Sequence, residues 1–451
     1  MSKRMLPTLC LLLLSLAACS SGDIEAPASI SVVIDGARLW DGTGAPPVED
    51  AILVIEGDRI GAVGPRSSVD APESARVIDA RGLTLIPGII NAHAHVGMVR
   101  GLVEHPDNYD LANIRSQLRQ YARYGVTTVL SLGLDSGPMF EARGPAGAGE
   151  PPRATALIAG RGFTGAGGYP ASLAHLAGIP REVDTVEEAR THVRELAAEN
   201  VDVVKIWVDD HFGRYEKIRP ELYTAIIEEA HAAGLQVMAH VFYLEDAKGL
   251  VSAGVDGLAH NVRDREVDDA FIGMLLGSDT FVLATLTREE STAIYAEPPA
   301  FLDDPLLTRW AEPEVVRALK DPAYGAGVRE HVDYQRHRDQ FEMARINLKT
   351  LLDAGVRIGF GTDSGPPARF QGYFEHRELE LMVGLGMTPA ETLRIATLGS
   401  AESLGVDDEF GSLEAGKRAD FVLLGGNPLE DIRNTREIRS VWIGGREVAL
   451  D

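Results

Sequence analysis

Two histidines separated by a single residue form the most chemically suggestive pattern in the chain. His93 and His95 lie in the run Asn91-Ala92-His93-Ala94-His95. On a β-strand, residues i and i+2 point to the same face, so both imidazoles would face one way. Two imidazoles on one face are half of a typical transition-metal site. The apolar run that precedes them leads into the protein interior, which favours metal ligands over a pair of surface histidines.

Lys205 is the second unusual residue. It stands within the apolar run Val203-Val204-Lys205-Ile206-Trp207-Val208, where an ammonium group would be costly to bury without a partner. Desolvation would lower its pKa and free the amine to react with carbon dioxide. The resulting carbamate is an anion that can bridge two cations. A lysine whose head group leaves the interior at a strand end is the alternative.

Three further residues end short apolar runs. His240 closes Val-Met-Ala-His, His260 closes Gly-Leu-Ala-His, and Asp363 closes Gly-Phe-Gly-Thr-Asp before a Ser-Gly-Pro loop. Either histidine alone would more often be a hydrogen-bonded core residue. Asp363 has the pattern of a carboxylate delivered into a loop at a strand end. Among the other histidines, only His175 and His211 fall near the predicted loops at these strand ends.

The elements that must position these residues follow from the hydrophobic period. From Gly88 onward, short apolar strands alternate with amphipathic helices, which argues for a parallel sheet. Eight strands are predicted, the number that closes a (β/α)8 TIM-type barrel, with its active site at the carboxyl ends of the strands. They span residues 89–94, 126–132, 154–159, 201–208, 235–240, 257–260, 281–286 and 356–361.

The two ends of the chain have a different period. Short β-type runs separated by Gly-containing turns occur near both ends, and neither set is long enough to bury a core alone. We therefore predict an α/β fold in which a small β-sandwich domain, built from both chain ends, accompanies the barrel. The predicted divisions are 30–86 for the first part of the sandwich, 87–398 for the barrel with a lid at 288–336, and 399–451 for the second part.

The first residues predict export. Residues 1–18 have a short basic start and an apolar stretch too short to span a bilayer, as a signal peptide does. The run Leu16-Ala17-Ala18-Cys19 is typical of a bacterial lipobox, so we expect lipidation at Cys19 and a tether over 19–29. Ser20 is not the aspartate associated with inner-membrane retention, which predicts an outer-membrane lipoprotein facing the periplasm. A plain signal peptide with a chance cysteine is the alternative.

Composition limits the partners. The chain has 451 residues, 45% of them hydrophobic, and a formal net charge of −24, which describes a globular protein and excludes nucleic acid as a partner. We expect a small amide or peptide as substrate. We expect contact with a membrane only through the lipid anchor, and a homo-oligomer stays open.

The run Gly160-Arg161-Gly162-Phe163-Thr164-Gly165 matches a dinucleotide fingerprint. No helix begins after it, so a nucleotide site is not favoured.

Taken together, these motifs resemble the amidohydrolase superfamily, in the branch of imidazolonepropionase-like and prolidase-like metal-dependent hydrolases. The resemblance runs from about Ile34 to Val448. It is carried by the Gly36–Gly42 opening, the Ile86-Pro87-Gly88 lead into His93-Ala94-His95, the run Gly361-Thr362-Asp363-Ser364, and the closing run Gly411–Asp420.

The resemblance implies a barrel that holds two divalent cations, with zinc as the expected metal. One cation would be bound by His93, His95 and Asp363, the other by His240 and His260, with carbamylated Lys205 between them. A hydroxide bridging the metals would attack the carbonyl, and Asp363 would pass its proton to the leaving amine. Imidazolonepropionase-type members use one metal and lack this lysine, so Lys205 favours the binuclear, peptide-cleaving side.

The implied function is hydrolysis of an amide or peptide C–N bond, on prolidase-like or N-acyl amino acid substrates. A cyclic amide, imidazolone or lactone hydrolase using the same site is an alternative, and a non-catalytic lipid-anchored binding protein is another. Prolidase-like members tend to carry Gly-Gly-His after the third strand and a tyrosine two residues past the fifth-strand histidine. Here those positions are Gly167-Gly168-Tyr169 and Phe242. Tyr169, Tyr243 and Arg263 are therefore candidates for a different polar substrate contact.

Overall fold

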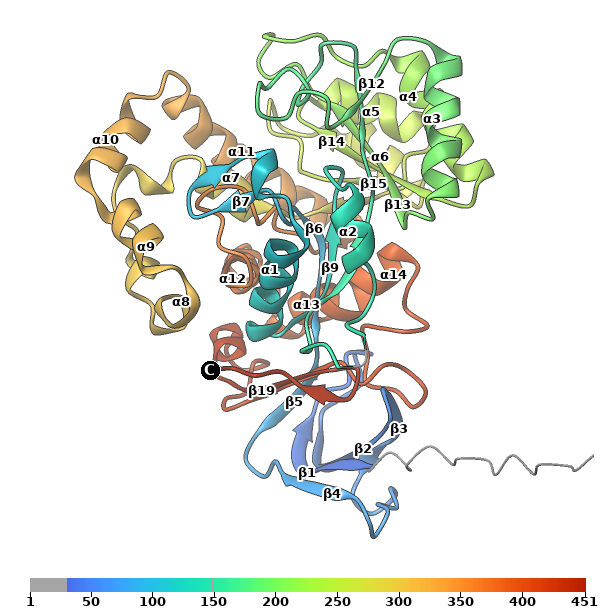
Figure 1. Ribbon diagram of the computed structural model, residues 1–451, viewed down its shortest axis with the longest axis vertical. Coiled ribbons are helices and arrows are strands. Elements are labelled where there is room, and N and C mark those ends of the chain that lie inside the picture. The colour runs from blue at the N-terminus through green and yellow to red at the C-terminus, as the bar shows by residue number, and fades with distance from the viewer. Residues whose placement is uncertain (1–30, 148) are drawn as a thin grey trace, which may run out of the picture.

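The computed structural model describes residues 31–147 and 149–451. It has two parts, a β-sheet at one end and a larger α/β part above it (Figure 1). The predicted signal peptide, lipidation site and tether, residues 1–29, lie outside the described residues. Within the described part of the chain, no helix is both long and apolar enough to cross a membrane.

The β-sheet at the base draws its strands from both ends of the chain, as predicted. Its hydrogen-bonded order is β20-β19-β18-β5-β1-β2-β3, and β4 also pairs with β1. Because β4 and β5 pair with opposite halves of β1, the sheet forks there. The strands are β1 (Val32–Leu39), β2 (Val48–Glu56), β3 (Arg59–Pro65), β4 (Arg76–Asp79), β5 (Thr84–Pro87), β18 (Phe421–Leu424), β19 (Ile438–Ile443) and β20 (Arg446–Glu447).

The α/β part is the predicted TIM-type barrel, with parallel strands at each of the eight predicted positions. Its strands are β6 (Ile89–Ala94), β9 (Val126–Ser131), β10 (Thr155–Ile158), β13 (Val203–Val208), β14 (Gln236–Val241), β15 (Gly257–Leu258), β16 (Phe281–Leu283) and β17 (Ile358–Gly359). The circle closes where the Ala92 amide donates to the Phe360 carbonyl oxygen at 3.0 Å.

Short strands extend the barrel at its rim. The third barrel strand breaks after β10 and resumes as β11 (Phe163–Gly165), which pairs with both β12 (Arg181–Val183) and β13. The run that matched a dinucleotide fingerprint therefore enters a strand rather than a helix. A small hairpin, β7 (Val99–Arg100) with β8 (Val103–Glu104), follows the first barrel strand.

Helices surround the barrel, and their starts follow ordinary capping rules. Thr185 and Thr388 form capping boxes with Glu188 and Glu391. The helices of the barrel are α1 (Leu111–Arg123), α2 (Gly137–Ala142), α3 (Val186–Ala198), α4 (Pro220–Ala232), α5 (Leu244–Ser252), α6 (Asp269–Leu276), α11 (Tyr334–Asp353), α12 (Tyr373–Gly384), α13 (Pro389–Arg394) and α14 (Ser400–Leu404). Single turns are η1 (Pro106–Asn108), η4 (Ile395–Gly399) and η5 (Ile432–Arg436).

The segment predicted as a lid is mostly helical. It contains α7 (Leu286–Ser291), η2 (Ile294–Ala296), η3 (Ala300–Asp303), α8 (Pro305–Trp310), α9 (Pro313–Lys320) and α10 (Pro322–Glu330). The last three helices each begin with proline, whose fixed φ suits a first helical position. In Figure 1 they form an arm beside the barrel. Buried Leu302, Leu307 and Leu319 join one apolar cluster with Tyr124 and Tyr373, which fixes the arm against α12, while a lid role stays a prediction.

Candidate metal centre

A group of potential metal ligands meets at the carboxyl ends of the barrel strands. His93, His260 and Asp363 each offer an atom, all within 4.8 Å of one another, and all three side chains are buried. The Nε2 atom of His95 lies 3.0 Å from the Asp363 Oδ1 atom. The ring of His240 is centred 4.7 Å from that of His260. The histidines and the aspartate predicted from the sequence are therefore brought together.

Hydrogen bonds leave one nitrogen free on each of two rings. The Nδ1–H of His93 donates to the Ala259 carbonyl oxygen at 3.1 Å, which leaves its Nε2 facing Asp363. The Nε2–H of His240 donates to Asp209 at 2.9 Å, which leaves its Nδ1 unprotonated. Such outer partners fix the tautomer and orientation of a ligating histidine. Burial lowers the pKa of His240 to about 4 despite Asp209, so its ring is neutral and able to bind a cation at neutral pH.

His260 is oriented through its other nitrogen. Its Nδ1 lies 3.0 Å from the Thr285 hydroxyl oxygen, which directs Nε2 toward the site. Burial, followed by the charges of His240 and His93, holds the pKa of His260 well below its ordinary value. Thr285 and Asp209 were not identified from the sequence. Asp209 directly follows an apolar strand, a signal that could have been noticed, whereas Thr285 carries none.

Asp363 is held by its backbone and by an arginine. Its amide donates to the His93 carbonyl oxygen at 2.8 Å, and its φ is 55°, in the left-handed region. Arg369 donates from Nη1 to Oδ2 at 2.7 Å. Burial alone would raise the pKa of Asp363, but Arg369 and the histidines outweigh it and keep the pKa well below its ordinary value. The carboxylate is therefore charged, and its buried Oδ1, 3.0 Å from His95 Nε2, accepts no well-formed hydrogen bond from the described residues.

Lys205 lies in the middle of β13 with a fully buried side chain. Its Nζ has no hydrogen-bond partner among the described residues. Burial lowers its pKa to about 7, although the charge of Asp363 opposes that shift. A Cβ at Gly133 would lie 2.7 Å from Lys205 Cγ, and one at Gly162 would lie 3.0 Å from Lys205 Cβ. Two glycines thus make room for a buried amine that forms no hydrogen bond or ion pair with the residues that the structure describes.

These observations fit a bound divalent cation. Imidazole nitrogens and a carboxylate oxygen are the donors that zinc and similar metals use in barrel enzymes. The buried Oδ1 of Asp363, the Nδ1 of His95 and the Nζ of Lys205 all lack hydrogen-bond partners in the described protein. Burying polar atoms without hydrogen bonds costs free energy. Bonds from these atoms to a metal would remove that cost.

The predicted substrate contacts differ in their surroundings. Tyr169 lies over the site, with its ring centred 5.8 Å from that of His240 and 5.2 Å from that of His211. The Tyr243 hydroxyl instead donates to Asp210 at 2.7 Å. Tyr169 is thus the candidate nearest to the histidines, and His211 is its neighbour. His175 lies apart from them, 3.3 Å from Glu104.

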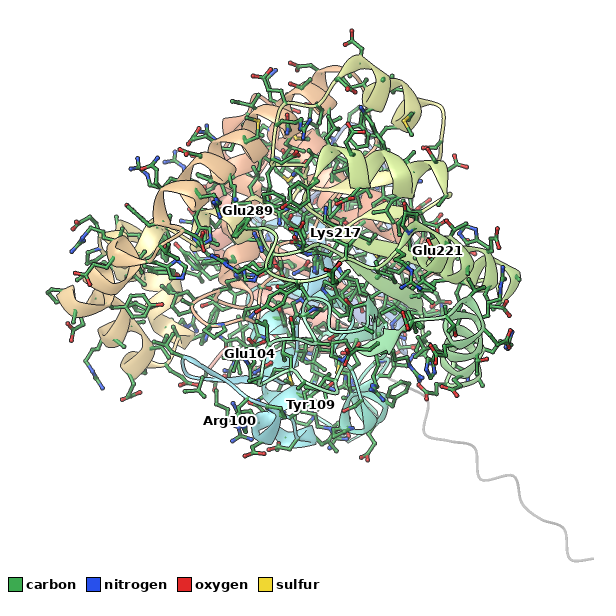
Figure 2. All side chains as sticks on the ribbon, turned by 90° about the horizontal axis from the view of Figure 1, so that it is seen from above. Arg100, Glu104, Tyr109, Lys217, Glu221 and Glu289 are labelled. Carbon is green, nitrogen blue, oxygen red and sulfur yellow. The ribbon has the colours of Figure 1, made fainter. Side chains whose placement is uncertain are left out.

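Arg263 is buried and makes contacts within the protein. It donates to the carbonyl oxygens of Val241 and Asn261 and forms a buried ion pair with Glu289 at 2.9 Å. Glu289 lies near the centre of the molecule when it is seen from above (Figure 2). The same carboxylate pairs with Arg288 at 2.7 Å. Arg288 is partly exposed, and its Nε lies 3.7 Å from Asp363 Oδ2.

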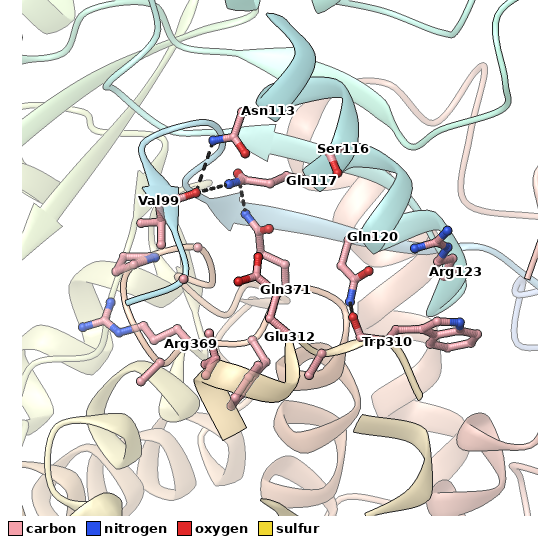
Figure 3. Close-up of a pocket in the computed structure, with 17 residues that line it drawn as sticks. Val99, Asn113, Ser116, Gln117, Gln120, Arg123, Trp310, Glu312, Arg369 and Gln371 are labelled. Atoms are coloured by element: carbon pink, nitrogen blue, oxygen red, sulfur yellow. Dashed lines mark hydrogen bonds between the residues drawn. The ribbon is translucent and has the colours of Figure 1, made fainter. Parts of the chain in front are cut away.

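A cavity of about 270 Å³ lies beside the loop that follows His95 (Figure 3). Carboxamides on its wall support that loop. Gln117 accepts from the Gly97 amide at 2.6 Å, and Gln371 donates to Gln117 and to the His95 carbonyl oxygen. Arg369 also lines the cavity, but none of the candidate metal ligands does. The cavity therefore borders the metal centre without containing it.

The barrel and its ligand cluster define the class of TIM-barrel metallohydrolases. The sequence pattern of the family described as "Amidohydrolase family" matches residues 84–448, and the chain belongs to this family. It is therefore a hydrolase that acts on carbon–nitrogen bonds, which confirms the predicted enzyme class.

Comparisons with individual proteins agree with the family. The chain is 27% identical to ochratoxinase from Aspergillus niger over 93% of this chain and 86% of that protein. It is 26% identical to imidazolonepropionase from Deinococcus radiodurans over 89% and 92%. A solved prolidase in complex with N-methylphosphonate-L-proline is similar at a TM-score of 0.70 and 26% identity, over 93% of this chain and 99% of that one. The relatives carry different activities, so the family is shared and the substrate is not fixed by it.

Proposed function

We propose that this protein is a binuclear metal-dependent hydrolase that cleaves the amide bond of N-acyl amino acids or dipeptides. The observation that carries the proposal is Lys205, a buried amine without a hydrogen-bond partner beside the ligand cluster. Its charge acts on His93 and His240, and that of Asp363 acts on it. These effects put Lys205 within electrostatic range of members of both predicted ligand sets, which supports a bridging role.

The pKa of Lys205 supports carbamylation. An amine with a pKa of about 7 is substantially neutral at physiological pH. Its nitrogen can attack the carbon of CO2, with loss of one proton, to give a carbamate. The new group is an anion with two oxygens, which suits the space between two cations better than an ammonium does.

Bound divalent cations would supply Lewis acidity and a water nucleophile active near neutral pH. His93, His95 and Asp363 would hold one of them, and His240 and His260 the other. Asp363 also has the position of a proton carrier, because its Oδ1 faces the ligand cluster while Arg369 holds Oδ2. It would take the proton of the attacking water and deliver it to the departing amine nitrogen.

The rim supports a substrate with a free carboxylate. Arg288 is the partly exposed cation beside Asp363, and Tyr169 overlies His240. An arginine suits a planar carboxylate through paired hydrogen bonds. The acyl group would then lie toward the aromatic side of the rim, where the ring centres of Phe212 and Phe242 are 5.5 Å apart. The names of the prolidase and ochratoxinase relatives are compatible with this class of substrate.

Lys205→Ala tests the binuclear site. We expect wild-type protein supplied with zinc and bicarbonate to contain about two metal ions per chain, and the variant about one or fewer. Lys248→Ala is the matched control, because Lys248 pairs with Asp268 on the barrel exterior. Elemental analysis gives the metal content, and ¹³C NMR after addition of ¹³C-bicarbonate reports a carbamate.

The same proteins are assayed on N-acyl amino acids, dipeptides and the corresponding lactones. Hydrolysis of the amides should be at least 10²-fold slower in Lys205→Ala than in the control. A wild-type metal content of one that Lys205→Ala leaves unchanged would overturn the binuclear proposal. Metal binding without hydrolysis of any substrate would favour the binding-protein alternative, and a preference for lactones would favour the cyclic-substrate alternative.

A further inference from the structure

Two buried glutamates on α12 have no basic partner. Glu375 and Glu378 lie one helical turn apart, and both side chains are completely buried. Neither forms a salt bridge with any residue in the described ranges. An unpaired buried carboxylate is costly, so their retention in the interior requires strong hydrogen bonds. The donors that supply those bonds come from the ends of the strands that carry the metal ligands.

Glu375 connects two barrel strands through a single oxygen. Its Oε1 accepts from Asn91 Nδ2 at 2.5 Å, from the Thr362 hydroxyl at 2.8 Å and from the Ser364 hydroxyl at 2.7 Å. Thr362 and Ser364 stand on either side of Asp363. Glu375 therefore holds both neighbours of the Asp363 carboxylate, and its own Oε2 has no hydrogen-bond partner within residues 31–147 and 149–451.

The same network reaches the first histidine. The Oδ1 of Asn91 accepts from the His93 amide at 3.0 Å while its Nδ2 donates to Glu375. Tyr121 extends the network from α1, because its hydroxyl lies 2.7 Å from that of Ser364. Hydrogen bonds to a single carboxyl group thus connect the backbone of His93 to the turn that contains Asp363.

Glu378 holds the turn that orients another ligand. Its Oε1 accepts from the Leu286 amide, and its Oε2 accepts from both the amide and the hydroxyl of Thr287, each at 2.7 Å. The residue before Leu286 is Thr285, whose hydroxyl contacts His260. The carboxylate therefore fixes the backbone from which the histidine's hydrogen-bond partner projects.

Both turns contain a strained residue. Thr285 has φ 41° and Asp363 has φ 55°, left-handed values that are strained for residues other than glycine. Such a conformation persists only when its surroundings enforce it. The two glutamates bind the residues immediately beside these two positions, in addition to the bonds that His93 and Arg369 make to Asp363.

We propose that Glu375 and Glu378 are positioning residues that set the ligand atoms of Asp363 and His260 by clamping the two left-handed turns. The proposal rests on the proposed function in that it requires metal binding at this site, although not any particular substrate. It assigns α12, which contributes no ligand, a direct effect on metal affinity.

The two glutamates differ in their tolerance of glutamine. In Glu375→Gln the amide oxygen can occupy the position of Oε1 and keep all three donors, while the NH2 group replaces an oxygen without a partner. In Glu378 each oxygen accepts from a backbone amide. The glutamine of Glu378→Gln has only one oxygen, so in either orientation its NH2 group faces one of these amides. We therefore expect Glu378→Gln and Glu375→Ala to disturb the site and Glu375→Gln to rescue it.

The test uses the full chain loaded with Co²⁺, whose visible absorption reports the ligand geometry. Glu378→Gln and Glu375→Ala should change the spectrum and speed the loss of Co²⁺ to a chelator by about 10–100-fold, the range for orienting partners of ligands. Glu375→Gln should stay within a few-fold of the wild type. Glu380→Gln is the control, because Glu380 lies on the same helix but pairs with Arg436 near the surface.

Thermal unfolding of the same samples separates positioning from stability. If Glu378→Gln does not fold, Thr287→Ala removes only one of its donors and should shift the spectrum in the same direction by less. A folded Glu378→Gln with the spectrum and Co²⁺ loss of the wild type would overturn the proposal, as would an equal change in Glu380→Gln. Wild-type protein that binds no Co²⁺ would instead overturn the proposed function.

Discussion

At the scale of single residues, the chemistry converges on Asp363. One oxygen faces His95 and His93, the other is held by Arg369, and the backbone is bonded to the first metal-binding strand. The carboxylate can therefore bind a cation and move a proton without reorienting. A proton carrier matters more in the transition state than in ground-state binding.

Asp363→Asn separates these two roles. We expect kcat to fall by roughly 10²- to 10⁴-fold, the range for loss of a general acid–base group. Arg369 favours the orientation that keeps the amide oxygen on its own side, so metal content should fall as well. The comparison is made at matched metal occupancy, with Asp353→Asn on the exterior of α11 as control. More than a tenth of wild-type kcat would move the proton transfer to another residue.

The sequence could predict which candidate ligands gather at the rim but not the residues that orient them. His93, His95, His240, His260 and Asp363 end apolar strands, and a barrel brings all strand ends to one rim. Arg369 and Glu375 instead reach the site from a loop and a helix, and their positions depend on how those elements pack. No spacing in the sequence encodes that packing. Tyr243 was predicted from its position at the rim, but its hydroxyl is not directed toward the candidate ligands. A position at the rim therefore does not by itself place a side chain in the site.

At the scale of elements, strand ends show where local pattern gives way to tertiary contacts. The apolar run 281–286 predicted a strand, yet β16 ends at Leu283 because Thr285 turns into the left-handed region and α7 begins. Glu378 on α12 provides the bonds that hold this turn. The run 356–361 is likewise reduced to β17, Ile358–Gly359. The order of the elements was predictable from periodicity, whereas these ends depend on a helix that follows much later.

Gly365 tests how tightly the two ligand loops fit. A Cβ at this position would lie 1.9 Å from the His95 carbonyl oxygen, and its φ is 115°. Gly365→Ala should therefore destabilise the protein by roughly 1–3 kcal/mol and weaken metal binding, since His95 must move. Gly273→Ala is the control, because a Cβ there meets no atom within 4 Å. If Gly365→Ala lost its metal to a chelator at the wild-type rate, the position of one ligand loop would not depend on the other.

At the scale of the whole molecule, the sheet and the barrel meet at a buried acid. The Asp420 carbonyl oxygen accepts from Gly88, the residue that separates β5 from β6, and its Oδ1 accepts from the Gly444 amide. Burial raises the pKa of Asp420 from 3.8 to about 6. The folded protein therefore binds this proton more tightly than the unfolded chain does.

Asp420→Asn should expose that linkage. Because the folded-state pKa is raised, the carboxylate destabilises the fold above about pH 6, and the effect vanishes below about pH 4. The free energy of unfolding of the variant minus that of the wild type should thus be larger at pH 7 than at pH 4, by up to about 3 kcal/mol. Denaturant unfolding at both pH values measures it. A difference independent of pH would contradict the raised pKa.

The pairing of β5 with β18 also joins an early part of the chain to one that is made last. Leu85 pairs with Leu423, and only Gly88 separates β5 from the strand that bears His93. During synthesis that edge of β5 has no partner until nearly the whole chain has been made. Contacts between such distant segments form late in folding. The β-sheet that precedes the barrel is therefore complete only when both ends of the chain are present, so a truncated product lacks the support that β18 gives to β5, just before the strand that bears His93.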